Sequence, residues 1–512
     1  MAADSSTGTR EQDAARRRGR GLGYATRVQV SAHQFMARRA SLGMTRRRVR
    51  MESEPGRREW MSMLAGISLV VVICLGALLW SFLRPAGSVG SAKIVADQQT
   101  GALYVRVNDT LYPALNLASA RLIVGDASDP VRVRRAEIES RPRGPMVGIP
   151  GAPTTMVATT PLLSSWLVCD AVTKAFGAGA PEPVTVTVID GQPDLSDRRR
   201  VLDAPDGVLL RYGDDVWLIR DGHRSLVDAR QRPVLLALGV SSEALASARP
   251  MSRALFDAIP VASPLVVPTI PGMGGPAGFA GAPGPVGTVV STPQVQGNTA
   301  YSVVLIQGMQ TVSPIVAQIL ENAGGGVGPS RTVAGSVLAS LPSVNVLNTS
   351  AYPDESLKVV DTQSNPVTCW WWQRGAGEDR AQTSVVSGST LPVAAGQADD
   401  VVQLVKADKS GGQADQVYFA PNYANFIVST GNSISSQTKE TLWWVSESGV
   451  RLGVSRDEDS LRSLGLGTPP SLAPWAAVQL LAPGPVLSKV DALVRHDALP
   501  VDVNPGELEQ PR

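Results

Sequence analysis

The chain has 512 residues, of which 47 are Lys or Arg and 45 are Asp or Glu, so its formal net charge is only +2. This balance hides an asymmetry: residues 1–59 contain 14 Arg and 6 acidic residues, a net charge of +8, which leaves −6 for residues 60–512. The second part is mildly acidic overall, so nucleic acid is not an expected partner. The 49 Gly and 38 Pro residues favour short strands joined by turns over long helices.

The first 59 residues are expected to form a disordered tail over 1–24 and a basic amphipathic helix over 25–59. The apolar side chains of a candidate stripe on this helix are Val30, Phe35, Met36 and Leu42. The basic side chains around the stripe are Arg38, Arg39, Arg46, Arg47 and Arg48. Such a stripe is typical of a helix that docks on a protein partner or lies on anionic lipid headgroups. We predict docking on a cytoplasmic partner through Phe35, Met36 and the arginines; a purely topogenic arginine cluster, the simpler alternative, needs no stripe.

Residues 60–83, WMSMLAGISLVVVICLGALLWSFL, carry no charge and predict a transmembrane helix. A helix of this length rises by about 36 Å, enough to cross a hydrocarbon core of ~30 Å. The arginines before it hold its N-terminal side in the cytoplasm, which places the rest of the chain outside. A cleaved signal peptide is the alternative, but the run is too long, starts too late and lacks a small-residue cleavage site after Leu83. We expect an uncleaved single-pass anchor.

Beyond the anchor the sequence contains related segments, which indicate an internal duplication. Two pairs align: residues 104–125 with 301–324, and residues 217–240 with 443–466. The first pair shares a plan of two strands and a short helix, with Pro113 and Pro314 expected in the first turn of that helix. The second pair aligns without gaps, tryptophan on tryptophan, at Trp217 and Trp443.

The predicted fold class is a single transmembrane helix plus a large β-rich α+β domain, with four repeats arranged around a central β-domain by a pseudo-twofold duplication. The expected repeats are residues 84–155, 206–262, 300–352 and 413–498. The central domain is expected from residues 156–205 and 353–412, joined through a linker over 263–299 that is too rich in Pro and Gly for a helix or an interior strand. The C-terminal tail, 499–512, is expected to be extended or disordered.

The chain has three cysteines, Cys74, Cys169 and Cys369. Cys74 lies inside the predicted membrane helix and is interpreted as a small apolar residue. The other two lie in a compartment that permits disulfides, at matching places in the two halves, so a pair is the economical interpretation. In the chain-entropy model, closing a loop of ~200 residues contributes at most ~5 kcal/mol of stability.

Residues that carry catalytic chemistry are scarce. His33 falls on the cytoplasmic side, and neither His223 nor His496 belongs to a metal-ligand spacing, so no metal or cofactor is expected. The segment GGGVGPSRT at 324–332 lacks the Gly-Lys-Ser/Thr ending of a phosphate loop. The tryptophans of TCWWW at 370–372 are either a glycan-stacking platform or buried packing near the disulfide; buried packing is favoured, because at most two of the three share a face of a strand.

Several segments together resemble one known family: TRVQVSAHQFMARRASLGMTRRRVRMESEPGRR before the anchor, GALYVRVNDTLYPALNLASARLI after it, and then VGIPGAP, ARPMSRALFDAIP, TCWWW and QADQVYFAPNYANF. The combination is similar to EccB, the membrane core component of mycobacterial ESX (type VII) secretion systems, and most similar to the subfamily of the fifth system. The resemblance extends over nearly the whole chain.

This resemblance implies a single-pass subunit of the inner membrane that assembles with further copies of itself and with EccC, EccD and EccE, where EccC is the ATPase motor. It also implies association with the mycosin protease MycP in the periplasm, a periplasmic domain of four repeats, and a disulfide between Cys169 and Cys369.

Three functions compete on these observations. The first is a structural scaffold that links the cytoplasmic motor to a periplasmic assembly. The second is an ATP hydrolase, because members of the family are often catalogued as ATPases; the absence of a Walker motif in the sequence counts against it. The third is a peptidoglycan-binding anchor, for which no segment shows a distinctive signature. We favour the scaffold.

Overall fold

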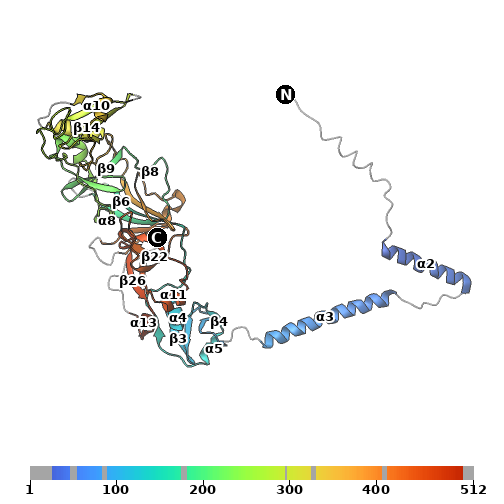
Figure 1. Ribbon diagram of the computed structural model, residues 1–512. Coiled ribbons are helices and arrows are strands. Elements are labelled where there is room, and N and C mark those ends of the chain that lie inside the picture. The colour runs from blue at the N-terminus through green and yellow to red at the C-terminus, as the bar shows by residue number, and fades with distance from the viewer. Residues whose placement is uncertain are drawn as a thin grey trace, which may run out of the picture. The chain divides into compact units, whose positions relative to one another are not determined.

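The computed structural model describes residues 26–46, 55–83, 89–173, 182–294, 297–324, 330–405 and 412–499. The expected tail over 1–24 and, apart from Leu499, the expected tail over 499–512 lie outside these residues. The chain divides into two compact units, Met1–Ala86 and Gly87–Arg512 (Figure 1).

The helices described in the first unit are α2 (Arg27–Arg46) and α3 (Pro55–Leu83). A reciprocal capping pair starts α2: the Thr26 N–H donates to Gln29 Oε1 at 3.0 Å, and the Gln29 N–H donates to Thr26 Oγ1 at 3.4 Å. Proline at the first position of α3 costs no hydrogen bond, because a first-turn N–H has no partner within the helix. The basic region expected as one helix over 25–59 is therefore divided, since its last residues already belong to α3.

The second unit is built on a sheet of seven strands in the order β20-β21-β7-β6-β18-β19-β8. In that order the strands are Val402–Gln403, Gln416–Phe419, Val184–Asp190, Leu163–Val172, Val367–Gly375, Gln382–Gly388 and Arg199–Val201. The long strands β6 and β18 pair antiparallel at the middle, from Leu163 opposite Gly375 to Ala171 opposite Val367. Segments separated by about two hundred residues thus form one sheet, and β21 extends it past residue 412, the expected end of the central domain.

Four smaller sheets have a common strand plan: an antiparallel meander of three strands and a further strand parallel to the first of them. The first outer sheet contains β1 (Ile94–Asp97), β2 (Leu103–Val107), β3 (Thr110–Ala114), β4 (Val131–Val133), β5 (Met146–Val147) and β27 (Arg495–His496). The second contains β9 (Asp206–Tyr212), β10 (Asp215–Arg220), β11 (His223–Val227) and β12 (Arg249–Pro250), with β17 (Lys358–Val359) also pairing with β9. The third contains β13 (Val289–Pro293), β14 (Thr299–Val304), β15 (Met309–Val312) and β16 (Arg331–Thr332). The fourth contains β22 (Phe426–Thr430), β23 (Leu442–Val445), β24 (Val450–Val454), β25 (Ser471–Pro474) and β26 (Ala482–Leu487).

A helix follows each meander: α4 (Leu117–Val124), α6 (Arg232–Leu238), α9 (Pro314–Ala323) and α11 (Glu458–Leu464). Each ends at a glycine in the left-handed conformation, with φ of 78°, 73°, 63° and 76° at Gly125, Gly239, Gly324 and Gly465. Glycine adopts this conformation without a Cβ penalty and so ends the helix sharply. The other helices are α5 (Arg135–Glu139), α7 (Ser242–Ala246), α8 (Arg253–Ala258), α10 (Gly335–Ala339), α12 (Trp475–Val478), α13 (Lys489–Ala492) and the 3₁₀ helix η2 (Ala395–Asp400).

Buried apolar cores join these sheets in a fixed order. The largest core contains Trp370 of the central sheet, Leu255 of α8 and Ala477 of α12, so it packs the second and fourth outer sheets against the central one. A second core joins Leu122 of α4 to Leu452 of β24, and in Figure 1 α4 lies beside α11. A third core joins α6 to α9. The packing order is therefore first, fourth, central, second and third sheet.

Two features differ from the sequence expectations. Pro314 opens α9 as predicted, but Pro113 lies within β3, because α4 starts after a different cap, Asn116. Within the expected linker 263–299, residues Val289–Pro293 form β13, an interior strand between β14 and β16. Its two valines are buried, and that burial outweighs the low strand propensity of the Pro- and Gly-rich surroundings.

Candidate functional site: the basic helix and the cross-braced sheet

The candidate docking helix α2 presents its apolar side chains to solvent. Phe35 is 43% exposed and Met36 is 61% exposed, while Arg38 and Arg39 follow on the next turn. Arg46 ends the helix, and Arg47 and Arg48 lie outside the described residues.

Because α2 is one continuous helix, its geometry shows which apolar side chains share a face, and this set differs from the expected stripe. Residues in an α-helix are separated by ~100°, so Val30 lies ~140° from Phe35 and does not share its face. Val28 does share it, because Val28, Phe35 and Leu42 are spaced seven residues apart, a step of only ~20° around the axis. Arg39 lies ~40° from Phe35 on the same face. The stripe is therefore Val28, Phe35 and Leu42, bordered by Met36 and interrupted by one arginine.

The helix α3 is long enough to cross a membrane. Within the described residues, Glu59–Leu79 is the one segment that combines the required length and apolar composition, and none of it is buried in the protein. The 29 residues of α3 rise by about 44 Å. Trp60, near its N-terminal end, is 65% exposed, as expected for an indole at a membrane interface.

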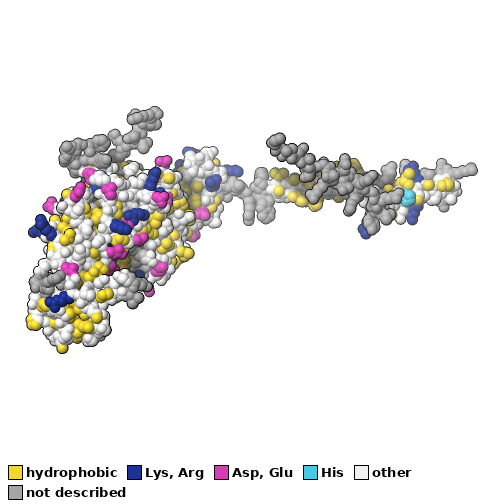
Figure 2. Space-filling view, turned by 90° about the horizontal axis from the view of Figure 1, so that it is seen from above, with side chains coloured by type: hydrophobic (Ala, Val, Ile, Leu, Met, Phe, Trp, Pro, Cys, Tyr) yellow, Lys and Arg dark blue, Asp and Glu magenta, His cyan; other side chains and the backbone are white. Residues whose placement is uncertain are grey.

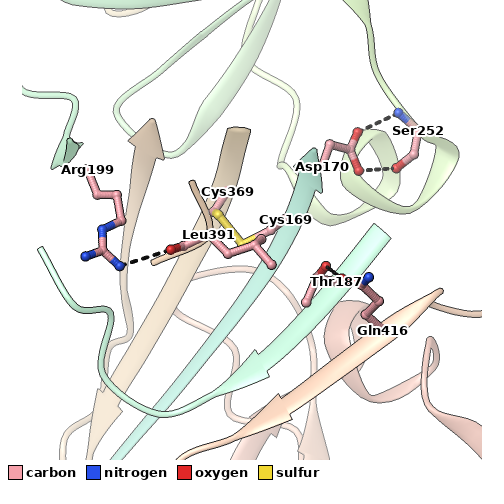
Figure 3. Close-up of a disulfide and its surroundings, with 8 residues drawn as sticks. All are labelled: Cys169, Asp170, Thr187, Arg199, Ser252, Cys369, Leu391 and Gln416. Atoms are coloured by element: carbon pink, nitrogen blue, oxygen red, sulfur yellow. Dashed lines mark hydrogen bonds between the residues drawn. A yellow bond between two sulfur atoms is a disulfide. The ribbon is translucent and has the colours of Figure 1, made fainter. Parts of the chain in front are cut away.

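In the second unit, Cys169 of β6 and Cys369 of β18 form a disulfide across the middle of the central sheet (Figure 3). The two residues lie directly opposite each other in the strand register, with Cα atoms 3.9 Å apart. Both are fully buried, in an apolar cluster with Leu167, Ile189 and Val386. The bond joins residues 200 positions apart in the sequence, so it covalently links the two halves of the sheet.

The tryptophans beside Cys369 alternate between the two faces of β18. Trp370 and Trp372 are fully buried in the largest core, together with Trp166 of β6. Trp371 points to the other face, where its indole N–H donates to the Ser165 hydroxyl at 3.0 Å. Two of the three rings are thus unavailable for stacking on a glycan, which leaves buried packing as their role.

A buried carboxyl group next to the disulfide fastens α8 to the central sheet. The carboxyl oxygens of Asp170 accept hydrogen bonds from the Ser252 N–H and hydroxyl, both at 2.6 Å (Figure 3). Ser252 in turn caps α8, because its hydroxyl accepts from the Leu255 N–H at 3.0 Å. Burial outweighs these hydrogen bonds and raises the pKa of Asp170 to about 7. Burial also raises the pKa of Asp190, which accepts from the Ala424 N–H.

Two arginines each lie against a pair of aromatic rings where the second and fourth outer sheets meet the central one. The guanidinium of Arg224 lies 3.8 Å from the ring centre of Phe256 and 5.5 Å from that of Trp217. The guanidinium of Arg451 lies 5.1 Å from Trp443 and 5.2 Å from Trp475. Burial lowers the pKa of both arginines. The alignment in sequence identified the paired tryptophans but not the arginines, whose spacing from them differs by one residue.

The histidines outside the first unit have structural hydrogen bonds. A ring nitrogen of His223 lies 2.8 Å from the Asp221 carbonyl, and one of His496 lies 2.8 Å from the Gly148 carbonyl. Among the residues that the structure describes, no group of three or more His, Cys, Asp or Glu side chains could hold a metal ion.

Comparison with known proteins gives a match over almost the whole chain. Residues 22–501 match the family described as type VII secretion system ESX-1, transport TM domain B. The chain is 56% identical over 495 residues to the ESX-5 secretion system ATPase EccB5 of Mycobacterium tuberculosis (strain CDC 1551 / Oshkosh), covering 96% of this chain and 98% of that relative.

Two solved structures are similar. One is a chain in an intact ESX-5 inner membrane complex, a composite C3 model, with a TM-score of 0.77, 55% identity, and coverage of 96% of this chain and 99% of the other. The second is a chain in the periplasmic assembly from the ESX-5 inner membrane complex, with a TM-score of 0.73, 56% identity, and coverage of 82% and 100%.

Proposed function

The chain belongs to the EccB family of type VII secretion systems, and on this premise we propose that it is a structural core subunit of an ESX-5-type complex in the inner membrane. The observation that carries the proposal is its similarity, over 96% of its length, to a chain of an intact ESX-5 inner membrane complex. In this role the chain links a cytoplasmic motor, EccC, to an assembly in the periplasm. The first unit, with a basic helix followed by an apolar helix, and the large β-rich second unit suit such a link.

The proposed orientation places the N-terminus in the cytoplasm and the second unit in the periplasm. The charge asymmetry of +8 before the anchor and −6 after it supports this orientation. The similarity of 82% of the chain to a chain of a periplasmic ESX-5 assembly supports it as well.

For the second unit we propose four repeats related in pairs by a pseudo-twofold axis through the central sheet. The common strand plan, the glycine that ends each first helix and the two arginine–aromatic contacts support this arrangement. The packing order of first, fourth, central, second and third sheet is also what a twofold axis produces when it exchanges the two halves of the chain. A covalent bond near such an axis braces the domain where both halves meet.

The proposed partners are EccC, EccD, EccE, the mycosin protease MycP and further copies of this chain. The C3 description of the similar intact complex supports association between copies. We assign the contact with EccC and EccD to α2, whose apolar side chains Phe35 and Met36 are exposed. Apolar side chains exposed on a helix that is otherwise rich in arginine suit burial against a protein partner.

The double variant Phe35→Ser/Met36→Ser tests the docking role. We expect it to insert into the membrane normally, because no arginine is changed, but to be missing from the complex on native gels of detergent extracts. Val30→Ser is the matched control, since it removes an apolar side chain of the same helix on another face. If the double variant assembles and supports secretion as well as the control does, α2 is only topogenic.

Nucleotide hydrolysis is a second candidate function, because the M. tuberculosis relative is named an ATPase. The best candidate for a phosphate loop, residues 324–332, follows the C-terminus of α9, where Gly324 is the cap. A phosphate loop instead runs directly into a helix, whose N-terminal N–H groups and positive dipole end bind the phosphates, whereas here β16 lies before the next helix, α10. The carbonyl end of α9 has the opposite polarity, so this segment does not favour nucleotide binding.

A further inference from the structure

We propose that a basic cleft between the central sheet and the fourth outer sheet binds an extended peptide segment in which carboxylates alternate with apolar side chains. The cleft has a volume of about 630 Å³. It is lined by the start of β6, the residues after β18, and parts of β22, β23 and β25. This inference extends the scaffold function proposed above, since it adds the chemistry of one partner contact.

The charges that line the cleft all have the same sign. They belong to Arg374, Lys439 and Arg456, and no acidic side chain lines it. On the face of the second unit shown in Figure 2, by contrast, basic and acidic side chains are interspersed. Lys439 and Arg456 flank the β23–β24 hairpin, where the Arg456 guanidinium donates to the Lys439 carbonyl at 2.8 Å, and the fold brings Arg374 of β18 to them. A cleft with one sign of charge between low-dielectric walls concentrates the field that attracts an oppositely charged ligand.

The charge of Arg374 has no carboxylate partner among the residues that the structure describes. This arginine is 6% exposed, and its guanidinium donates to the carbonyls of Glu378 and Ser436 at 2.8 and 2.7 Å and to the Gln437 side chain at 3.4 Å. The Glu378 carboxylate does not line the cleft and accepts instead from the Gly375 N–H at 3.1 Å. A buried cation held only by neutral dipoles is stabilised when an anion binds nearby.

Apart from the hydroxyl groups of Thr160, Ser164 and Ser471, the remaining side chains of the wall are apolar, and they select the kind of anion. Leu162, 83% exposed, lies at the cleft together with Val428, Leu442 and Leu472. Inorganic phosphate would leave these side chains unused, whereas a segment with leucine-like side chains between its carboxylates satisfies both parts. The volume is also within the range of pockets that enclose ligands the size of a short peptide, ~300–1,000 Å³.

The probe is a fluorescein-labelled peptide, Leu-Glu-Pro-Leu-Glu-Leu, and the readout is its fluorescence anisotropy with the full-length chain in detergent. We expect saturable binding that weakens with added salt and is at least about tenfold weaker for Leu-Gln-Pro-Leu-Gln-Leu. The variant Lys439→Glu/Arg456→Glu should weaken binding of the acidic peptide by about tenfold or more. Both replaced side chains are exposed, so folding should be retained.

The matched control is Arg132→Glu/Lys489→Glu, which reverses two exposed cations that do not line the cleft. Equal loss in both variants, or no loss in either, would overturn the assignment. Displacement of the peptide by dodecyl phosphate micelles but not by unlabelled peptide would assign the cleft to lipid instead and also overturn it. The assay uses the isolated chain, so a failure here leaves the assembly test of the scaffold function unaffected.

Discussion

Removing the disulfide should destabilise the second unit strongly without destroying its fold. The double variant Cys169→Ala/Cys369→Ala deletes the bond and leaves no buried thiol or hydroxyl unpaired. With 200 residues between the cysteines, the chain-entropy model gives a loss of about 5 kcal/mol at 25 °C as an upper value. The loss acts chiefly on the unfolded chain, because the β6–β18 ladder and the buried tryptophans remain.

The expected fall in melting temperature is at most about 6 °C. It follows from an unfolding entropy of ~2.1 cal/mol/K per residue over a unit of ~400 residues, or ~0.8 kcal/mol per degree. Differential scanning fluorimetry of the full-length chain in detergent, followed at the tryptophans, measures it directly. Cys74→Ala is the matched control and should not change the transition, because Cys74 is a free cysteine of α3.

An unchanged melting temperature for Cys169→Ala/Cys369→Ala would refute the idea that the bond braces the two halves. It would mean that the unfolded chain is already restrained in another way. A fall far above about 6 °C would also contradict the entropic argument, because the β6–β18 ladder would then depend on the bond for native contacts.

Three further predictions follow from the site and the charges. The folded pKa of Asp170, about 7, lies above its unfolded value of 3.8, so the unfolded chain releases this proton first and the free energy of unfolding falls as pH rises from about 4 to about 7. Asp170 lowers the free energy of unfolding by at most roughly 4 kcal/mol over this range. The variant Asp170→Asn should therefore have a smaller difference between its melting temperatures at pH 5 and pH 7.5 than the unchanged chain. Equal differences in the two proteins would show that the Asp170 carboxyl group stays ionised. Protease added to spheroplasts should digest the second unit and spare a tag at residue 1, and cleavage of the tag would exclude the proposed orientation. The purified chain should not hydrolyse ATP with magnesium above background, and turnover abolished by a point mutation in this chain would favour the ATPase name of its relative.

Periodicity, charge and turn residues predicted local features well. The uncharged run over 60–83 predicted the apolar helix, and Pro314 predicted the first turn of α9. The pairing of the cysteines followed from their number and their places in the two halves. These features depend on residues close in sequence or on a choice among very few candidates.

Features that depend on tertiary packing were missed. β13 lies in a Pro- and Gly-rich segment, and only its neighbours on both sides make it a strand. The raised pKa of Asp170 arises from burial of its carboxyl group in the folded unit, where its hydrogen-bond partner, Ser252, lies 82 residues away in the sequence. The basic cleft is assembled from Arg374, Lys439 and Arg456, none of which belongs to a basic cluster in the sequence. A sequence pattern contains no signal for such long-range contacts.

The central claim, that this chain is a structural subunit of an inner-membrane secretion complex, is tested most directly by purifying it through a tag from membranes of a strain that lacks the untagged copy. On a native gel followed by mass spectrometry, we predict one species several times larger than the 53.8 kDa chain, containing EccC and EccD. Migration of the chain alone, under conditions in which EccC and EccD still migrate together, would contradict the claim.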